Sequence, residues 1–277
     1  MITATLLALG AAVLHAGWNL AVKTSGDRWI ALWGQMTAAA LVGLPLVIWS
    51  TADGSLHLAA WGWAALSGGI HTVYIARLAR TYDIADFSVT YPIARGGGAL
   101  VAAIGGVVLL GDHLSLASGI GIAVVVVGLA LIAGHVDWTH ARAALFVALM
   151  IGCYTLADSR GSRGSASSVY AWSIFIPTSL GVTTHGIVAR RGRAMLASIR
   201  PMWRTFLLTG LASAVTYWMV LAAVKRAPVG YVTALRESSV VLATFIGWRY
   251  LRESSGRRRI AASLVVLAGL VTLVAGR

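Results

Sequence analysis

Apolar stretches of about 20 residues recur along the whole chain, and short polar connections separate them. An apolar helix of this length crosses the hydrocarbon core of a bilayer. We therefore predict an all-α integral membrane protein with ten transmembrane helices, near residues 3–22, 29–50, 58–78, 86–110, 115–134, 142–159, 168–188, 203–224, 229–250 and 258–275. The first stretch leads directly into further spans and lacks a small-residue cleavage site, so we expect a helix there rather than a signal peptide.

Composition supports a membrane protein. Only 11% of the 277 residues are charged, whereas soluble domains carry roughly 25%. The net charge of +13 would suggest nucleic acid as a partner in a soluble protein, but these charges lie between apolar segments. We interpret them as determinants of topology and contacts with anionic headgroups, so no nucleic-acid partner is expected. Cys153 is the only cysteine, which excludes an internal disulfide.

The distribution of lysine and arginine predicts an orientation. The odd-numbered connections hold 15 of these residues, and the even-numbered connections and termini hold 5. Because cytoplasmic loops are enriched in Lys and Arg, we expect the odd-numbered connections in the cytoplasm and both termini outside. The expected location is the cell membrane, inner or plasma, crossed many times.

The chain contains an internal repeat. A shift of 141 residues places Arg95 on Arg236, and just past each helix it places Asp112 on Glu253. Five spans per half is an odd number, so the second copy enters the membrane from the opposite side. This predicts two inverted five-helix repeats, residues 1–136 and 137–277. Such repeats commonly hold a substrate site near the midplane between them.

Arg95 and Arg236 are unusual because they lie inside apolar stretches. A charge at the bilayer centre costs about 2.5–3.5 kcal/mol on insertion scales, so such residues are usually retained for a site or a partner. They could bind an anionic group such as a carboxylate or phosphate. They could instead neutralise Asp158 or Glu237 inside the bundle, or extend to the interface.

Other polar residues repeat on single helix faces. A shift of 139 residues places His15 and Asn19 on Tyr154 and Asp158, and each pair is spaced i, i+4. These residues could hydrogen-bond a substrate, or they could only bond a neighbouring helix. Asp158 and Glu237 are candidates for proton coupling, with salt bridging or simple solvation as the alternatives.

Aromatic residues near these positions could form pocket walls, although aromatics in bundles more often only pack. The candidates are His71, Tyr74, Tyr91, Tyr217 and Trp218. Pro92 removes a hydrogen bond to the carbonyl of Ser88, so its helix can kink just before Arg95. A kink beside a buried arginine favours a binding site there.

The sequence resembles the EamA family of the drug/metabolite transporter superfamily. The motifs that carry the resemblance are HAGWNLAVK at 15–23, YPIARGGG at 91–98, LLGDHLS at 109–115 and ALRESSVV at 234–241. The resemblance implies ten helices in two inverted halves. The family usually has Glu at the position of Asp112, and Glu253 keeps that residue in the second half. Members usually have cytoplasmic termini, the reverse of the orientation that the charges predict.

The favoured hypothesis is a secondary transporter that moves a small polar metabolite, anionic or zwitterionic, by alternating access. The expected binding residues are Arg95, Arg236, His15, Trp18, Asn19, Tyr91 and Tyr154, with Glu237 or Asp158 for coupling. The sequence has no ATP-binding motif and no GxSxG, HExxH or metal-spaced Cys/His pattern, so no enzyme, metal or cofactor is expected.

The expected partners are a small-molecule substrate and the lipid bilayer, with a coupled proton or ion and a second copy of the chain (a homodimer) as further candidates. Three alternatives remain open at this point. They are a lipid or lipid-linked sugar flippase of the same superfamily, a membrane-embedded enzyme, and an accessory subunit that transports nothing.

Overall fold

The computed structural model describes residues 2–110, 115–133, 136–162, 167–224, 226, 232, 235–254 and 256–275. Within these ranges the ordered elements are helices, and no residue lies in a strand. Asp112, which supports one repeat match, lies outside the described residues. The same holds for Arg163, Lys225 and Arg277, which enter the charge count, and for the first residues of the predicted span 229–250.

The first five predicted spans are helices. They are α1 (Ile2–Lys23), α2 (Arg28–Ala52), α3 (Leu58–Ile84), α4 (Phe87–Leu110) and α5 (Leu116–Ala133). Asp27 caps α2, because its side chain accepts a hydrogen bond from the backbone N–H of Ile30 at 3.0 Å. Pro92 lies inside α4, as the sequence predicts. The apolar pattern therefore locates this half of the chain well.

The second half departs from the prediction at three places. Its helices are α6 (Trp138–Gly161), α7 (Ser167–Ser173), α8 (Phe175–Val188), α9 (Gly192–Val224), α11 (Ser239–Arg249) and α12 (Gly256–Ala275). The predicted span 168–188 is two helices, α7 and α8, that meet at Ile174. Helix α9 begins well before the predicted residue 203, and the prediction missed its first turns because their charged residues lower the local hydropathy.

The third departure concerns Glu237 and Ser238, which the sequence places inside a regular helix. In the structure Leu235 and Arg236 are helical, and the chain makes tight turns at Glu237 and Ser238, just before α11. Backbone hydrogen bonds there join residues three apart, from Ser238 N–H to Leu235 O (3.1 Å) and from Val240 N–H to Glu237 O (3.0 Å). Hydropathy reports burial and not backbone geometry, so it could not reveal this local tightening.

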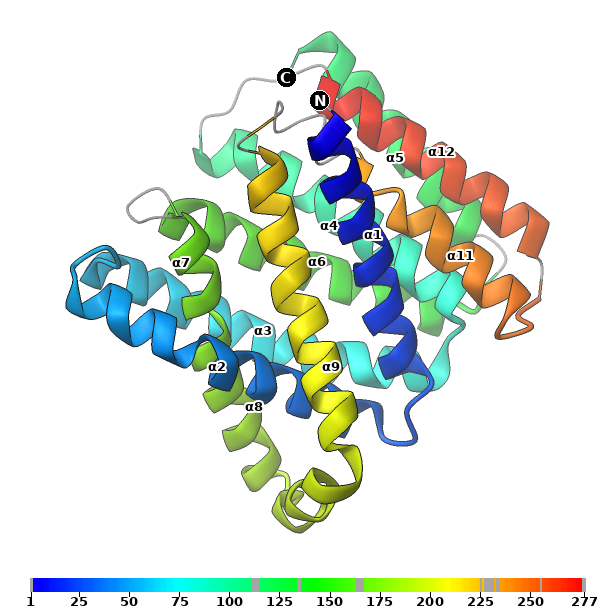
Figure 1. Ribbon diagram of the computed structural model, residues 1–277. Coiled ribbons are helices and arrows are strands. Elements are labelled where there is room, and N and C mark those ends of the chain that lie inside the picture. The colour runs from blue at the N-terminus through cyan, green and yellow to red at the C-terminus, as the bar shows by residue number, and fades with distance from the viewer. Residues whose placement is uncertain are drawn as a thin grey trace.

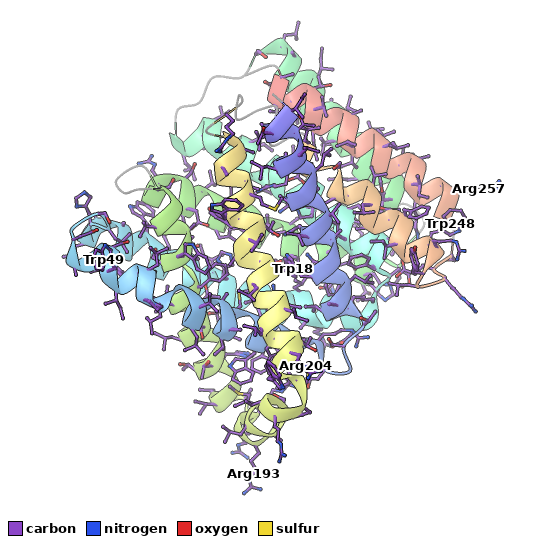
Figure 2. All side chains as sticks on the ribbon, in the orientation of Figure 1. Trp18, Trp49, Arg193, Arg204, Trp248 and Arg257 are labelled. Carbon is purple, nitrogen blue, oxygen red and sulfur yellow. The ribbon has the colours of Figure 1, made fainter. Side chains whose placement is uncertain are left out.

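Helix lengths agree with a membrane protein. Six helices of the described residues are long and apolar enough to cross a bilayer, namely α1, α2, α4, α5, α6 and α12. Helix α9 has 33 residues, so it spans about 50 Å at 1.5 Å per residue. Figure 2 shows Trp18 near the middle of the bundle and Trp49, Arg193, Trp248 and Arg257 at its periphery, as expected for interfacial anchors.

The helices of the two halves interlock. Helix α1 packs along α9 and also contacts α11, whereas α6 packs along α4 and α3 (Figure 1). Helices α5 and α12 lie side by side at one edge of the bundle. The large buried side chains Tyr82, Phe87 and Tyr91 form part of the principal core. Helices of each half therefore pack extensively against helices of the other half.

The bundle has two distinct ends. The α1–α2, α3–α4 and α11–α12 connections meet at one end, which we call the lock end, through bonds from Lys23 to Ala85 and from Phe87 to Glu253. At the opposite end α4 and α6 finish together, where Arg160 Nη2 donates to the carbonyl of Leu109 at 3.0 Å. We call this second end the cavity end, because the central cavity of the bundle extends toward it.

Close packing of α5 on α12 leads to a stability prediction. A Cβ at Gly121 would lie 2.3 Å from the backbone nitrogen of Leu273, whereas a Cβ at Gly119 would meet nothing within 4 Å. Because backbone cannot yield as a side chain can, we expect Gly121→Ala to cost about 1–3 kcal/mol. Thermal unfolding in detergent should show a lower Tm for Gly121→Ala and an unchanged Tm for Gly119→Ala. Equal Tm values would contradict the close approach.

Candidate substrate-binding site

A cavity of about 380 Å³ lies in the bundle between the two halves. It extends to Ser159 and Ser162, where α6 ends, and so reaches toward the cavity end. Its lining comes from α1 to α4, α6 to α9, and the turn before α11. The lining residues are His15, Trp18, Met36, His71, Tyr74, Arg95, Tyr154, Thr155, Asp158, Ser159, Ser162, Ala171, Ile174, Phe175, Thr178, Ser213, Thr216, Tyr217, Val220 and Arg236.

Arg95 and Arg236 meet at this cavity. Arg95 Nη2 forms a short ion pair with Glu237 Oε1, and Arg236 Nη2 lies 3.2 Å from the same oxygen. The Glu237 side chain is 2% exposed, that of Arg95 12% and that of Arg236 30%. One buried carboxylate therefore serves two guanidinium groups, and this group of three side chains, which we call the arginine centre, carries a formal charge of +1.

The turn before α11 explains how sequence neighbours pair. In a regular helix Arg236 and Glu237 would point about 100° apart, so their adjacency in sequence does not predict a contact. The tight turn brings Arg236 Nη2 to Glu237 instead. Glu237 Oε2 and the Nε atoms of both arginines have no hydrogen-bond partner among the residues that the structure describes. The centre therefore retains unused hydrogen-bonding capacity beside the cavity.

Helix α6 forms a polar wall of the cavity. Thr155, Asp158, Ser159 and Ser162 follow one another at i, i+3, i+4 and i+7, which places them on one helix face. Asp158 Oδ1 accepts a hydrogen bond from the Tyr170 hydroxyl at 3.1 Å. Asp158 also lines the cavity, three residues before the end of α6.

Aromatic side chains line the cavity next to this wall. Tyr154 stacks on His71 with ring centroids 3.9 Å apart, and Tyr74 meets Tyr154 edge to face at 5.7 Å. On the α1 side, His15 and Trp18 contact each other at 4.9 Å. The expected residues His15, Trp18 and Tyr154 thus share one cavity with both arginines.

Asn19 and Tyr91, also expected to bind substrate, do not line the cavity. Asn19 is 3% exposed, and it accepts a hydrogen bond from the Tyr82 hydroxyl at 2.8 Å. Tyr91 is 2% exposed and contacts Phe87 at 5.3 Å and His15 at 6.0 Å. We call Asn19, Tyr82, Phe87 and Tyr91 the sealing layer, because they fill the space between His15 and the lock end.

Two further expected residues also lie outside the lining. Glu237 is buried behind the two arginines and reaches the cavity only through them. Trp218, considered as a pocket wall, is 56% exposed on the outside of α9. Its neighbour Tyr217 does line the cavity, because the two side chains leave the helix on different faces.

Sequence reasoning missed the polar residues of α9 and α8. Ser213 and Thr216 line the cavity, and Ser213 Oγ also receives a short hydrogen bond from the Gln35 side chain. Thr178 of α8 lines it as well. The spacing of Ser213, Thr216 and Tyr217 at i, i+3 and i+4 was a readable signal, since it marks one polar face in an apolar helix.

Metal ligation is not a feature of the described residues. Among them no group of three His, Cys, Asp or Glu side chains is placed to hold a metal ion. The polar chemistry of the cavity is therefore that of guanidinium, carboxylate, hydroxyl and imidazole groups. Such groups bind and orient a polar organic molecule.

Comparison with known proteins supports first the class of membrane protein and then a family match. The helical fold and its apolar spans are those of a multi-pass integral membrane protein. Residues 141–275 match the EamA-like transporter family, which belongs to the drug/metabolite transporter superfamily. The resemblance noted in the sequence is thereby confirmed. Members of this family are typically membrane transporters.

One solved crystal structure of a protein is similar over 99% of this chain and 98% of its own, with a TM-score of 0.65 and 18% sequence identity. At this identity the similarity shows the fold alone. No curated protein matches the chain. Substrate and mechanism must therefore be argued from the cavity itself.

The arginine centre predicts a specific pattern of stability. Glu237→Gln leaves Arg95 buried without a counter-charge, which typically costs about 3–5 kcal/mol. The double change Arg95→Met with Glu237→Leu should cost less than the sum of the two single changes. Thermal unfolding in detergent is measured for the unmodified protein, Glu237→Gln, Arg95→Met, Glu237→Leu and the double change.

Asp83→Asn is the matched control for this cycle. Asp83 pairs with Arg28 at 2.7 Å but is 52% exposed, and exposed pairs contribute about 0–1 kcal/mol. A Tm loss for Glu237→Gln no larger than that for Asp83→Asn would show that the ion pair is not buried as described.

Proposed function

We propose that the protein is a secondary transporter that moves a small anionic or zwitterionic metabolite by alternating access. The observation that carries the proposal is the arginine centre, in which one carboxylate neutralises only one of two guanidinium groups at a shared cavity. A substrate carboxylate or phosphate supplies the missing negative charge. Arginine suits this role because its planar fork can bind both oxygens of such a group.

The packing of the halves supports alternating access around this centre. In the proposed inverted repeats, residues 1–136 and 137–277, α1 and α6 occupy equivalent positions. Helix α1 packs on helices of the second half, and α6 packs on helices of the first half. Arg95 and Arg236 come from different halves, so relative movement of the halves would change the distance between them. Binding of a substrate held by both arginines would therefore change with that movement.

The cavity also suggests individual roles. Arg95 and Arg236 bind the anionic group, whereas His15 and Tyr154 offer hydrogen bonds and Trp18 an apolar wall. Asp158 is the better candidate for coupling to a proton or ion, because it faces the cavity while Glu237 lies behind the arginines. Substrate would reach Asn19 and Tyr91 only when the sealing layer opens.

The remaining proposals concern the membrane location, the orientation, the energy source and the assembly of the protein. We propose the cell membrane, inner or plasma, as the location. The odd-numbered connections, which include those of the lock end, are placed in the cytoplasm because they hold most of the Lys and Arg. Energy would come from an ion or proton gradient or from exchange. A homodimer remains a candidate assembly.

Transport assays test the proposal directly. A thermal-shift screen of the purified protein against carboxylates, phosphates and zwitterionic amino compounds selects a ligand for flux measurements in proteoliposomes. We expect Arg95→Ala and Arg236→Ala each to lower flux at subsaturating ligand by about tenfold or more, because each removes charge-assisted hydrogen bonds.

Arg142→Ala is the control, since Arg142 is an exposed residue near the start of α6. It should leave flux unchanged. Unaltered flux and binding in both Arg95→Ala and Arg236→Ala would refute the site. Stabilisation by lipids alone, with transbilayer movement of labelled lipid, would favour a flippase instead.

A further inference from the structure

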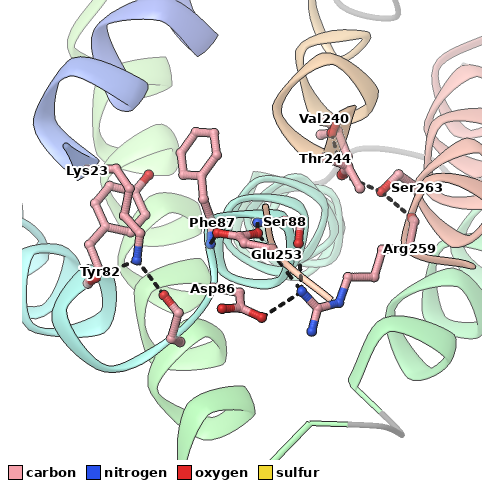
Figure 3. Close-up of polar contacts among 11 residues, drawn as sticks. Lys23, Tyr82, Asp86, Phe87, Ser88, Val240, Thr244, Glu253, Arg259 and Ser263 are labelled. Carbon is pink, nitrogen blue, oxygen red and sulfur yellow. Dashed lines mark hydrogen bonds and ion pairs between the residues drawn. The ribbon is translucent and has the colours of Figure 1, made fainter. Parts of the chain in front are cut away.

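Glu253, which lies between α11 and α12, caps a helix of the other half. Its Oε1 accepts the backbone N–H of Phe87 at 2.6 Å, and its Oε2 accepts that of Ser88 at 2.8 Å (Figure 3). These N–H groups belong to the first turn of α4, where no helical acceptor exists. A carboxylate at this position also meets the positive end of the helix dipole. Glu253 thus holds the start of α4 at two points.

Two backbone features let Glu253 reach α4. Arg252 has a φ of 56°, in the left-handed region, which turns the chain sharply after α11. Gly247 lies directly against the start of α4, and a Cβ there would be 2.5 Å from Glu253 Oε2 and 3.0 Å from Ser88 N. Any side chain at residue 247 would therefore displace the carboxylate from the cap.

Arg259 of α12 strengthens the same contact. Its Nη1 donates to Asp86 Oδ2 at 2.7 Å and to Ser88 Oγ at 2.8 Å, and it lies 3.9 Å from Glu253 Oε2 (Figure 3). The Arg259 side chain is 11% exposed and that of Glu253 is 7% exposed. Asp86 is 43% exposed. These groups form a network between the halves around the buried Glu253 and Arg259 side chains, which we call the lock.

Lys23 holds the other side of the α3–α4 connection. Its Nζ donates to the carbonyls of Tyr82 and Ala85, both at 2.6 Å, and so satisfies the end of α3 (Figure 3). The connection is therefore fixed from α1 on one side and from the second half on the other. The lock differs from the Lys23 contact in that it crosses between the halves.

The lock lies on the far side of the sealing layer from the cavity. Tyr82 contacts Phe87 at 5.7 Å, Phe87 contacts Tyr91 at 5.3 Å, and Tyr91 contacts the cavity residue His15. No residue of the lock lines the described cavity. The lock therefore holds in place the helix start that carries Phe87 and Tyr91, the residues that separate the cavity from this end.

We propose that Glu253, assisted by Arg259, is the positioning residue that keeps the lock end closed, and that transport requires its release from the start of α4. The proposal rests on the proposed transport function. Release would free the first turn of α4 to move with the sealing layer, opening the cavity toward the lock end. The freed N–H groups and the carboxylate would then be exposed to water. Water molecules would form the hydrogen bonds that these groups now form with each other.

Cysteine accessibility tests the lock without any substrate. Cys153 is the only cysteine, so a Cys153→Ala protein can carry a single reporter, Thr216→Cys, at a cavity residue that is 7% exposed. A membrane-impermeant maleimide is applied to either side of sealed vesicles. We expect labelling from the cavity end alone when Glu253 is present. Glu253→Gln should lower that rate and raise labelling from the lock end, each by about tenfold, because the amide NH2 that replaces one carboxylate oxygen cannot accept the backbone N–H that it faces.

Asp137→Asn is the matched control. Asp137 also caps a helix, accepting the N–H of Thr139 at 2.7 Å, but within α6 and not between the halves. It should leave the labelling pattern unchanged. A merely structural role for Glu253 would lower Tm without a side-specific change in labelling. Should Glu253→Gln fail to fold, Arg259→Gln keeps the cap intact, removes its support, and should shift labelling in the same direction.

The outcomes separate this proposal from the transport function. Labelling of folded Glu253→Gln from the cavity end alone, at an unaltered rate, would overturn the lock. A side-specific shift in labelling together with absent flux for every tested compound would support the lock while rejecting the transport assignment. A shift accompanied by altered flux would support both.

Discussion

The sharing of Glu237 between Arg95 and Arg236 is the interaction on which the rest of the site depends. Neither arginine could remain inside the bundle at low cost without a counter-charge, and the single carboxylate comes from the turn before α11. This arrangement fixes α4 of one half against the α11 region of the other. It also leaves the arginine centre with excess positive charge beside the cavity, so the contact that stabilises the bundle also provides the charge proposed to attract a ligand.

A second charged contact between the halves divides the molecule into functional layers. The arginine centre lies beside the cavity, the sealing layer follows, and Glu253 with Arg259 closes the lock end. Both contacts join α4 to the region around α11 and α12. Helix α4 therefore carries Arg95, two residues of the sealing layer and the capped terminus within a few turns.

The helices of the first half and the meeting of the two arginines could be predicted from the sequence, for understandable reasons. Apolar length reports bilayer crossing directly, and the 141-residue repeat relates Arg95 to Arg236 through residue positions alone. The polar face of α6 was also readable, although only Tyr154 and Asp158 were chosen from it. What the pattern could not provide was backbone geometry, namely the break at Ile174 and the tight turn at Glu237.

The lock was beyond the reach of sequence patterns for a different reason. Glu253 and Phe87 are 166 residues apart, and a carboxylate that caps a distant helix has no characteristic local spacing. Asn19 and Tyr91 lie outside the cavity lining, and sequence alone could not show this, because a polar group in an apolar helix can bind a neighbour as readily as a ligand. Tyr82, whose hydroxyl donates a hydrogen bond to Asn19, has no distinguishing signal of its own in the sequence.

Pro92 has a consequence for the proposed transport cycle. It lies in α4 between Ser88, held by the lock, and Arg95, held by Glu237. The missing backbone hydrogen bond at a proline lets a helix bend there. The first turn of α4 can then swing while Arg95 keeps its ion pair, so an empty carrier could reset without cargo. Net movement of substrate in one direction would then need no counter-substrate, which distinguishes uniport or symport from obligatory exchange.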